Sequence, residues 1–250
     1  MLEKTFTAMI TPFRIDGSVD YDGFVANVNR QVEAGVSGIT LLGTTGETPT
    51  LTLEEQKKLL QLAVIEAKGK IHIMAGCGTN STASTIEKAK MCEDLGADSL
   101  LMINPYYNKP TQQGLIEHFS TISDLVESPI VLYNHPGRTG IDFTFETLKE
   151  IALLPNIAGI KQSSDNLSLT MQILGEQELE KENFVFLSGD DAMIFPTMTL
   201  GGQGVISVLS NFIPEVIVAL TECLASKNYE EAREIHYALL PLIESVFQET

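Results

Sequence analysis

Cysteine and histidine are scarce in this chain, and their positions argue against a disulfide framework and against a metal site. The three cysteines, Cys77, Cys92 and Cys223, are odd in number, far apart, and lack the Cys-x-x-Cys spacing of zinc sites. The four histidines show no ligand spacing either. His72 falls inside an apolar run and is interpreted as a core residue. We therefore expect no catalytic metal.

Basic residues are also few. Lysine and arginine total 16 against 33 aspartates and glutamates, which gives a formal net charge of −17. A surface this acidic repels nucleic-acid phosphates and anionic membranes, and no basic run offsets it. No apolar run approaches the roughly 18 residues that a membrane span requires, and residues 1–5 begin no signal-peptide pattern. We expect a soluble, cytoplasmic protein with no nucleic-acid or membrane partner.

What the chain does contain is a repeated alternation of short apolar runs and helical segments. Its 250 residues, 44% of them hydrophobic, suffice for one large domain. Alternation of strands and helices predicts a parallel sheet, and eight units predict an α/β fold of the closed (β/α)8 type, the TIM barrel, rather than a doubly wound open sheet. The predicted strands are residues 5–10, 38–42, 71–75, 99–103, 130–133, 157–161, 184–187 and 204–208.

Capping signals mark several of the intervening helices. Asp20 is expected to cap a helix that ends at Gly35, and residues 52–55 form a capping box. After the eighth strand the pattern predicts further helices, the last of which begins near residue 229. We therefore divide the chain into a catalytic barrel, residues 1–225, and a partial C-terminal helical extension, residues 226–250.

A lysine follows the sixth apolar run. Lys161 ends the run 157–161, and the polar segment 162–166 comes directly after it. Loops that follow the strands of a barrel meet on one face, where barrel enzymes have their active sites. A lysine there is suited to attack a carbonyl, because an apolar surrounding favours its neutral, nucleophilic form. The alternative is a lysine that ends a strand and extends to water.

The other loops on this face carry groups that bind or relay. Residues 43–46, Gly-Thr-Thr-Gly, offer hydroxyls and closely spaced backbone N–H groups that suit a carboxylate or phosphate, without the lysine of a nucleotide-binding P-loop. Tyr133 ends the fifth strand, and Tyr106 and Tyr107 follow the fourth. A tyrosine near an amine relays protons, although tyrosines also serve simply as packing residues.

Two further features have both a functional and a structural interpretation. Arg138, in a Pro-Gly turn, is suited to bind a substrate carboxylate, or is a solvated loop charge. Asp190 and Asp191 are either paired carboxylates or a helix cap. The whole set of loops, with a lysine, a carboxylate nest, an arginine and hydroxyls, is typical of a site for a small keto acid.

Together, these loops resemble those of the dihydrodipicolinate synthase/N-acetylneuraminate lyase family of class I pyruvate aldolases, over nearly the whole chain. The Gly-Arg-Thr-Gly motif indicates the dihydrodipicolinate synthase branch. The motifs that carry the resemblance are GTTGE at 43–47, NPYYNKP at 104–110, YN at 133–134, GRTG at 137–140, GIK at 159–161 and GVIS at 204–207.

The resemblance implies a homo-oligomeric lyase of lysine and diaminopimelate biosynthesis. Pyruvate would form an imine with Lys161, without any other cofactor, and its enamine would add to aspartate-4-semialdehyde to give 4-hydroxy-tetrahydrodipicolinate. Tyr133, Thr44 and Tyr107 would relay protons, with Tyr107 reaching the site of a neighbouring subunit. The substrates would be bound by Thr45 at the pyruvate carboxylate, Arg138 at the semialdehyde carboxylate, Ile206 through its carbonyl, and Gly189.

Two departures from the family pattern and two rival functions stay open. His135 stands where the family usually has an apolar residue. Relatives also usually continue with a longer helical extension, which bears on tetramer assembly. We therefore expect a homodimer or a homotetramer, without choosing between them. The first rival is a sister pyruvate aldolase or lyase that acts on keto-deoxy sugar acids or N-acetylneuraminate. The second is a barrel that binds a small acid but is catalytically impaired.

Overall fold

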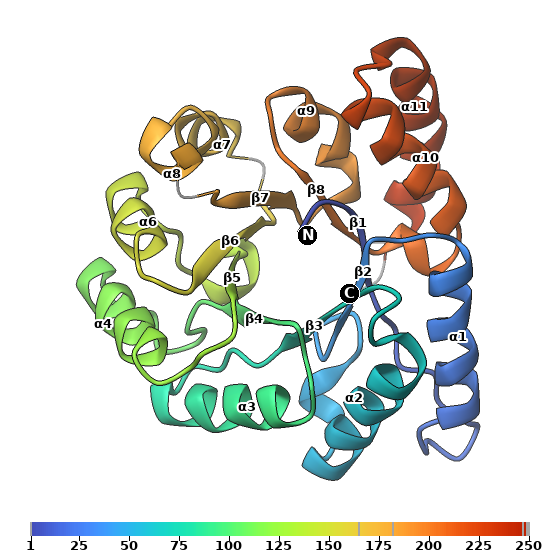
Figure 1. Cartoon of the computed structure of the whole chain (residues 1–250), viewed down its shortest axis with the longest axis horizontal. Helices are drawn as coiled ribbons and strands as arrows, with labels where there is room; N and C mark the ends of the chain where they lie inside the picture. Colours follow the sequence, from blue (N-terminus) through green and yellow to red (C-terminus); the bar gives the residue numbers. More distant parts are fainter. Residues whose placement is uncertain (1, 165, 182, 247, 249–250) are drawn as a thin grey trace.

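Eight parallel strands close into a barrel in sequence order, β1 to β8, in the computed structural model, which describes residues 2–164, 166–181, 183–246 and 248 (Figure 1). The predicted TIM barrel is thereby confirmed. The strands are Lys4–Ala8 (β1), Gly38–Leu41 (β2), His72–Gly76 (β3), Ser99–Ile103 (β4), Ile130–Asn134 (β5), Ile157–Gln162 (β6), Val185–Ser188 (β7) and Gly204–Ser207 (β8).

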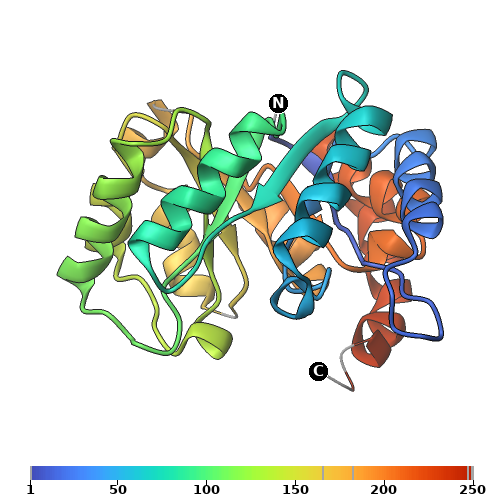
Figure 2. The same cartoon turned by 90° about the horizontal axis from the view of Figure 1, so that it is seen from below.

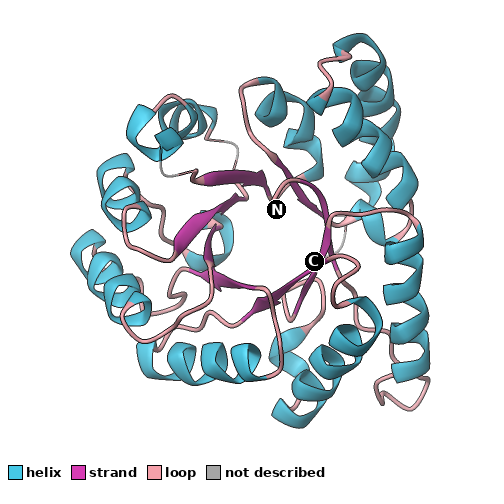
Figure 3. Ribbon diagram, in the orientation of Figure 1, coloured by secondary structure: helices cyan, strands magenta, loops and turns pink. Residues whose placement is uncertain are grey.

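Helices surround the ring of strands, as the secondary-structure colouring shows (Figure 3). They are Tyr21–Glu33 (α1), Leu53–Ala67 (α2), Thr82–Asp94 (α3), Gln112–Ser123 (α4), Pro136–Thr139 (α5), Phe145–Ala152 (α6), Leu167–Leu174 (α7), Gln177–Lys181 (α8), Ile194–Thr199 (α9), Pro214–Ala225 (α10) and Tyr229–Val246 (α11). Three short 3₁₀ helices are Thr48–Thr50 (η1), Asp191–Met193 (η2) and Leu209–Asn211 (η3).

The predicted helix starts are confirmed by their caps. The carboxylate of Asp20 accepts a hydrogen bond from the backbone N–H of Gly23 in the first turn of α1. At α2, Thr52 accepts from the backbone N–H of Glu55 while the Glu55 side chain accepts from the N–H of Thr52, which completes the capping box. These bonds satisfy N–H groups that the first helical turn leaves without partners.

Alternate residues of each strand face two different cores. The barrel interior is filled by one cluster that includes Phe6, Met74, Leu101, Tyr133 and Ile206. The residues between them on the strands point outward and pack against the helices in a second, larger cluster. This period of two places Tyr133 and Lys161, which are register partners in β5 and β6, on the interior side.

The Arg138 segment differs from its predicted turn. Residues 136–139 form the short helix α5, because Pro136 has the backbone angle of a first helical residue and lacks the N–H that would go unpaired there. Gly140, with φ of 72°, ends the helix in the left-handed conformation. Arg138 therefore sits on a fixed helical turn directly after β5.

Helices α10 and α11 pack together after the last strand (Figure 1). Ile217, Leu220, Leu224, Ala232 and Leu239 are buried in a cluster of their own at this contact. Seen from the side, the end of α11 extends beyond the neighbouring elements (Figure 2). The division at residues 225 and 226 falls between these two helices and stays a prediction. Among the described residues, no helix is both long and apolar enough to span a membrane.

Candidate active site

Lys161 is buried inside the mouth of the barrel. Its side chain is 7% exposed, and its Nζ lies 4.2 Å from the centre of the Tyr133 ring on the neighbouring strand β5. The ring face attracts a cation. In the described part of the chain, Lys161 forms no ion pair with a carboxylate. A buried amine without a carboxylate partner is the environment in which lysine acts as a nucleophile.

Gly189, after β7, makes room for this lysine. A Cβ atom at position 189 would lie 2.8 Å from Cε of Lys161 and 2.0 Å from Oγ of Ser163. No side chain fits there without displacing the reactive lysine. The geometry therefore explains the glycine by close approach to Lys161, and its predicted role in substrate binding stays a prediction.

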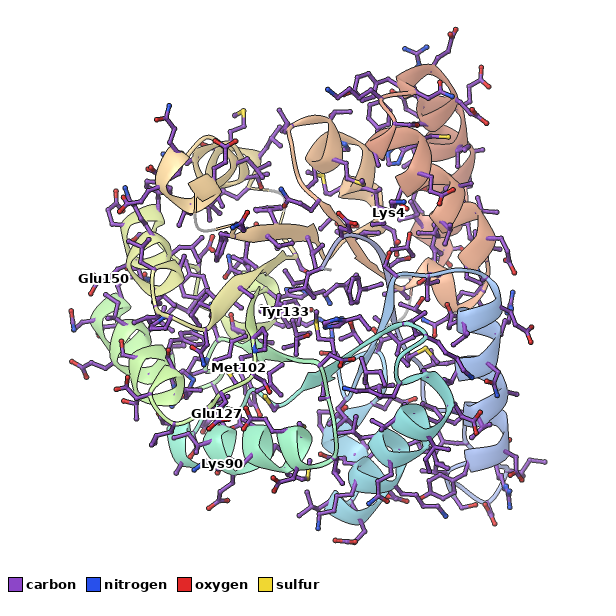
Figure 4. The ribbon with its side chains drawn as sticks, in the orientation of Figure 1. Lys4, Lys90, Met102, Glu127, Tyr133 and Glu150 are labelled. Carbon is purple, nitrogen blue, oxygen red and sulfur yellow. The ribbon has the colours of Figure 1, made fainter. Side chains whose placement is uncertain are left out.

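A cavity of about 480 Å³ opens at the C-terminal ends of the strands. It brings together four of the predicted residues, Thr44, Tyr107, Tyr133 and Arg138, from four different loops or strand ends. Figure 4 shows Tyr133 inside the ring of strands, whereas Lys90 and Glu150 lie on the surrounding helices α3 and α6. The side chains of Leu42, Leu101 and Ile103 form apolar parts of the cavity wall. Hydroxyls and one guanidinium in an apolar cavity suit a small polar anion.

The Gly43–Gly46 loop is held by its own hydrogen bonds. The N–H of Gly46 donates to the carbonyl of Gly43 at 3.2 Å, and the hydroxyl of Thr48 donates to the same carbonyl at 2.9 Å. The backbone N–H groups of Thr44 and Thr45 have no hydrogen-bond partner within the described residues. These two groups are therefore available to a bound carboxylate, as the sequence predicts for this loop.

Tyr107 is 88% exposed. Its backbone is in the left-handed region, with φ of 74°, which is uncommon for a bulky residue. The loop is fixed on one side by Asn108, whose Nδ2 donates to the carbonyl of Asn80 at 3.1 Å. No hydrogen bond connects the hydroxyls of Tyr107, Thr44 and Tyr133 among the described residues. The three residues of the predicted relay thus line one cavity, but within the described part of this single chain their hydroxyls are not hydrogen-bonded to one another.

The remaining predicted positions are buried or structural. Ile206 is fully buried inside the barrel, in the cluster that contains Tyr133, and the role of its carbonyl stays a prediction. Asp190 caps η2 by accepting from the N–H of Ala192. Asp191 accepts from the N–H groups of Val208 and Leu209 at 2.9 and 3.1 Å. Asp190 is therefore the helix cap, whereas Asp191 lies inside η2 and its carboxylate binds the backbone at the start of η3.

His135, the residue that departs from the family pattern, lies beside the site. Its ring is edge-on to the Tyr133 ring with the centroids 5.9 Å apart, and its Nδ1 is buried without a partner among the described residues. Burial, with the positive charges of Arg138 and Lys161 as smaller causes, lowers the pKa of His135 to about 4. The imidazole is therefore neutral near pH 7.

A buried amide network behind the site escaped the sequence-based prediction. Asn134 donates from Nδ2 to Asp142 at 2.6 Å and to Gln162 at 3.0 Å, and it accepts from Nδ2 of Asn104 at 3.1 Å. Asn104, Asn134 and Gln162 stand at the ends of β4, β5 and β6. The network holds these strand ends together on the side opposite to Tyr133 and Lys161. Polar residues at three successive strand ends were its only signal.

The described residues contain no group of three or more His, Cys, Asp or Glu side chains placed to hold a metal ion. The donors that gather at the mouth of the barrel are instead hydroxyls, backbone N–H groups and cationic nitrogens. Such donors bind anionic oxygen atoms, and they do not resemble a divalent-metal site.

Comparison with known proteins gives matches over the full chain. Residues 1–250 match the dihydrodipicolinate synthetase family. The 4-hydroxy-tetrahydrodipicolinate synthase of Methanocaldococcus jannaschii is 42% identical over 251 residues, which cover 100% of this chain and 85% of that protein.

Solved structures agree with this result. The dihydrodipicolinate synthase of Thermotoga maritima is 40% identical, with a TM-score of 0.97 over 100% of this chain and 85% of that one. The chloride-inhibited dihydrodipicolinate synthase of Acinetobacter baumannii, solved in complex with pyruvate, is 36% identical, with a TM-score of 0.95 and the same coverage of both chains. The chain belongs to the dihydrodipicolinate synthetase family.

Proposed function

We propose that this protein condenses pyruvate with L-aspartate-4-semialdehyde to form 4-hydroxy-tetrahydrodipicolinate, through an imine on Lys161. The observation that carries the proposal is the buried Lys161 amine, 4.2 Å from the centre of the Tyr133 ring. The relatives named 4-hydroxy-tetrahydrodipicolinate synthase support the choice of substrates. The relative that was solved with pyruvate supports an α-keto acid as the first of them.

The Lys161 amine attacks the keto carbon of pyruvate, and the carbonyl oxygen leaves as water to give the imine. Loss of a proton from the methyl carbon then gives the enamine, whose carbon attacks the aldehyde of the second substrate. The Tyr133 hydroxyl moves the protons of these steps, because Tyr133 is the tyrosine whose ring lies against the amine. Thr44 and Tyr107, from the same cavity, extend its relay. The covalent imine replaces any separate cofactor.

Two anchors orient the substrates. The unpartnered N–H group and the hydroxyl of Thr45 bind the pyruvate carboxylate, with the Ile206 carbonyl facing the imine and Gly189 leaving space beside it. Arg138, on the short helix α5 at the cavity wall, binds the carboxylate of the semialdehyde as a pair of charge-assisted hydrogen bonds. In this proposal the two anchors hold the enamine and the aldehyde together at Lys161.

The proposal includes a homo-oligomer, at least a dimer, in the cytoplasm. Tyr107 is 88% exposed and has a left-handed backbone conformation, so its side chain extends away from its own subunit's fold. A second copy that covers this tyrosine would complete the relay on each side. One relative of 39% identity is described as a monomeric variant of dihydrodipicolinate synthase, so the assembly needs its own measurement.

The test is reductive trapping. Borohydride added with pyruvate is expected to attach one reduced pyruvyl group, which mass spectrometry of peptides should locate on Lys161. Lys161→Ala should remain unlabelled. Lys109→Ala, which removes an exposed lysine of the Tyr107 loop, should be labelled like the wild type. A label on another lysine would remove the assignment to Lys161, and no label on folded wild-type protein would remove the imine mechanism.

The second substrate needs a separate assay. Product formation from pyruvate and aspartate-4-semialdehyde is compared with cleavage of keto-deoxy sugar acids and N-acetylneuraminate. We expect turnover with the semialdehyde only. Faster cleavage of the sugar acids would identify a sister aldolase, and labelling without turnover of any of these substrates would identify a pyruvate-binding barrel.

A further inference from the structure

A second hydroxyl group lies next to the reactive lysine and has no hydrogen-bond partner in the described part of the chain. Ser163 follows the last residue of β6 and is two positions after Lys161. Its backbone N–H is bonded to the carbonyl of Asn134 at 2.9 Å, which fixes the position of the residue. Its Oγ is shielded from solvent and has no hydrogen-bond partner among the described residues. Buried hydroxyls are nearly always bonded, so this one needs an explanation.

Gly189 shows how near this hydroxyl is to the reacting atoms. A Cβ on Gly189 would lie 2.0 Å from Oγ of Ser163 and 2.8 Å from Cε of Lys161. Oγ of Ser163 and Cε of Lys161, the carbon that carries Nζ, therefore both border the small space next to the Cα of Gly189. Tyr133 lies on another side of the amine, with its ring centre 4.2 Å from Nζ.

We propose that Ser163 is a further catalytic residue, whose hydroxyl accepts a hydrogen bond from the N–H of the protonated imine on Lys161. This inference rests on the proposed function. Among the described residues the hydroxyl makes no hydrogen bond, so its lone pairs are free to accept one. The N–H of the protonated imine is the donor that the proposal assigns to it. Nothing else in the described residues is bonded to it, so no existing contact has to break.

The chemistry follows from the electron balance of the imine. When the lysine nitrogen bonds to the keto carbon and water leaves, the nitrogen keeps one hydrogen and carries a positive charge. Loss of a methyl proton to a base then moves the C–H electron pair into a carbon–carbon double bond, and the iminium electron pair returns to nitrogen. An acceptor at the N–H stabilises the charged intermediate, so more of the enzyme is in the form from which the proton is lost.

The neighbouring serine provides a matched contrast. Ser164 Oγ accepts from Nε2 of Gln162 at 2.8 Å and from the N–H of Asn166 at 3.3 Å, so its hydroxyl is used by the fold. Ser163 contributes no such bond. A residue that stabilises the fold makes hydrogen bonds within it, as Ser164 does. A residue that serves catalysis can instead lower the stability of the folded protein. The two serines thus predict opposite responses to loss of their hydroxyls.

The experiment compares Ser163→Ala with Ser164→Ala. Ser163→Ala is expected to keep or raise the melting temperature, because it removes an unpaired buried polar group, while its kcat falls about tenfold or more, as for a lost hydrogen bond to a charged group. Borohydride labelling with pyruvate should still occur at Lys161, but more slowly. Ser164→Ala should lower the melting temperature and leave the labelling rate near that of the wild type.

A second variant guards against a misleading result. Ser163→Cys keeps the size of the side chain with a weaker hydrogen-bonding group, so its kcat should fall between those of wild type and Ser163→Ala. Wild-type kcat and labelling rates in both variants would overturn the role of Ser163 while leaving the imine at Lys161 intact. Wild-type protein that is folded but takes no label would overturn both the role of Ser163 and the proposed function.

Discussion

The two ends of the barrel each have a cavity of similar size, and their chemistry differs. The cavity at the C-terminal ends of the strands measures about 480 Å³, and the one at the N-terminal ends about 460 Å³. The first is lined by tyrosines, threonines, Lys88 and Arg138. The second is lined by prolines, asparagines, His72 and Glu127. Volume therefore does not distinguish an active site from a structural hollow in this protein.

The direction of the strands makes the difference. Parallel strands send all their following loops to one end, where loops can vary without disturbing the barrel. The segments at the other end connect helices back to strands, and Pro129 and Asn156 there shape those returns. Lys161 is near the end of β6, so its amine belongs to the C-terminal end.

The largest expected effect is that of Lys161→Ala. Turnover should fall by about a thousandfold or more, as on loss of a covalent nucleophile. Glu127→Gln, in the cavity at the opposite end, is the control and should keep wild-type kcat. Steady-state rates of both purified variants, with melting temperatures to show that each is folded, make the measurement. An equal loss in Glu127→Gln would end the functional contrast between the two ends.

Arg138→Ala is expected to have the next largest effect. Loss of one member of a desolvated charge pair costs about 2–5 kcal/mol, which corresponds to a fall of kcat/KM for the semialdehyde by about 30-fold or more. Pyruvate trapping at Lys161 should continue, since Arg138 does not hold the first substrate. Arg138→Lys keeps the charge without the planar fork and should recover only part of the loss. Unchanged semialdehyde kinetics would exclude Arg138 from the site.

Tyr107→Phe should lower kcat by about a hundredfold, the lower end of the range for proton relay. If Tyr107 acts in the neighbouring subunit, mixing Tyr107→Phe with Lys161→Ala subunits should restore activity, because each hybrid contains one site with both residues intact. Chromatography of differently tagged subunits must first show that hybrids form. Hybrids as inactive as their parents would mean that Tyr107 does not act across subunits.

The sequence predicted the family, the enzyme class and the barrel, and all three are confirmed. The reason is that each strand leaves a local signal, an apolar run with a cap or glycine near its end. Strand β4 matched its predicted limits, whereas β1 is Lys4–Ala8 against a prediction of 5–10. The N–H of Met9 still bonds the Thr40 carbonyl of β2, but the N–H of Ile10 bonds the side chain of Asn211 instead of a strand. Apolarity alone does not specify which residues pair.

The site was predicted in part, for a similar reason. Thr44, Tyr107, Tyr133 and Arg138 stand at or just after strand ends, in motifs that are visible in the chain, and they do meet in one cavity. The hydroxyl of Ser163 and Nδ1 of His135 have no hydrogen-bond partner among the residues that the structure describes, and this depends on neighbours from other strands. No local pattern shows that a polar atom lacks a partner. Such features become visible only once the barrel brings β5, β6 and β7 together.

Each end of the barrel has a partly buried histidine, and the two histidines have different charged neighbours. The smallest expected effect is on the pKa values of these two residues. Burial is the main cause that lowers the pKa of both His135 and His72. At His135 the charges of Arg138 and Lys161 act in the same direction, and its pKa is about 4. At His72 the carboxylate of Asp98 opposes the shift, and Nε2 is 2.8 Å from the Ser99 hydroxyl.

Arg138→Ala should therefore raise the pKa of His135 and leave that of His72 unchanged, as followed by the imidazole resonances in an NMR titration. Because the folded-state pKa of His135 is below its value of about 6.5 in the unfolded chain, the neutral ring contributes stability that is complete above pH 6.5 and is lost as the pH falls through about 4. His135→Asn, which cannot take up a proton, should remove this part of the acid destabilisation seen in thermal melts. Equal changes in the pKa values of both histidines in Arg138→Ala would contradict this expectation. They would show that the substitution acts through a general change in the fold, and not through the local charge of the arginine.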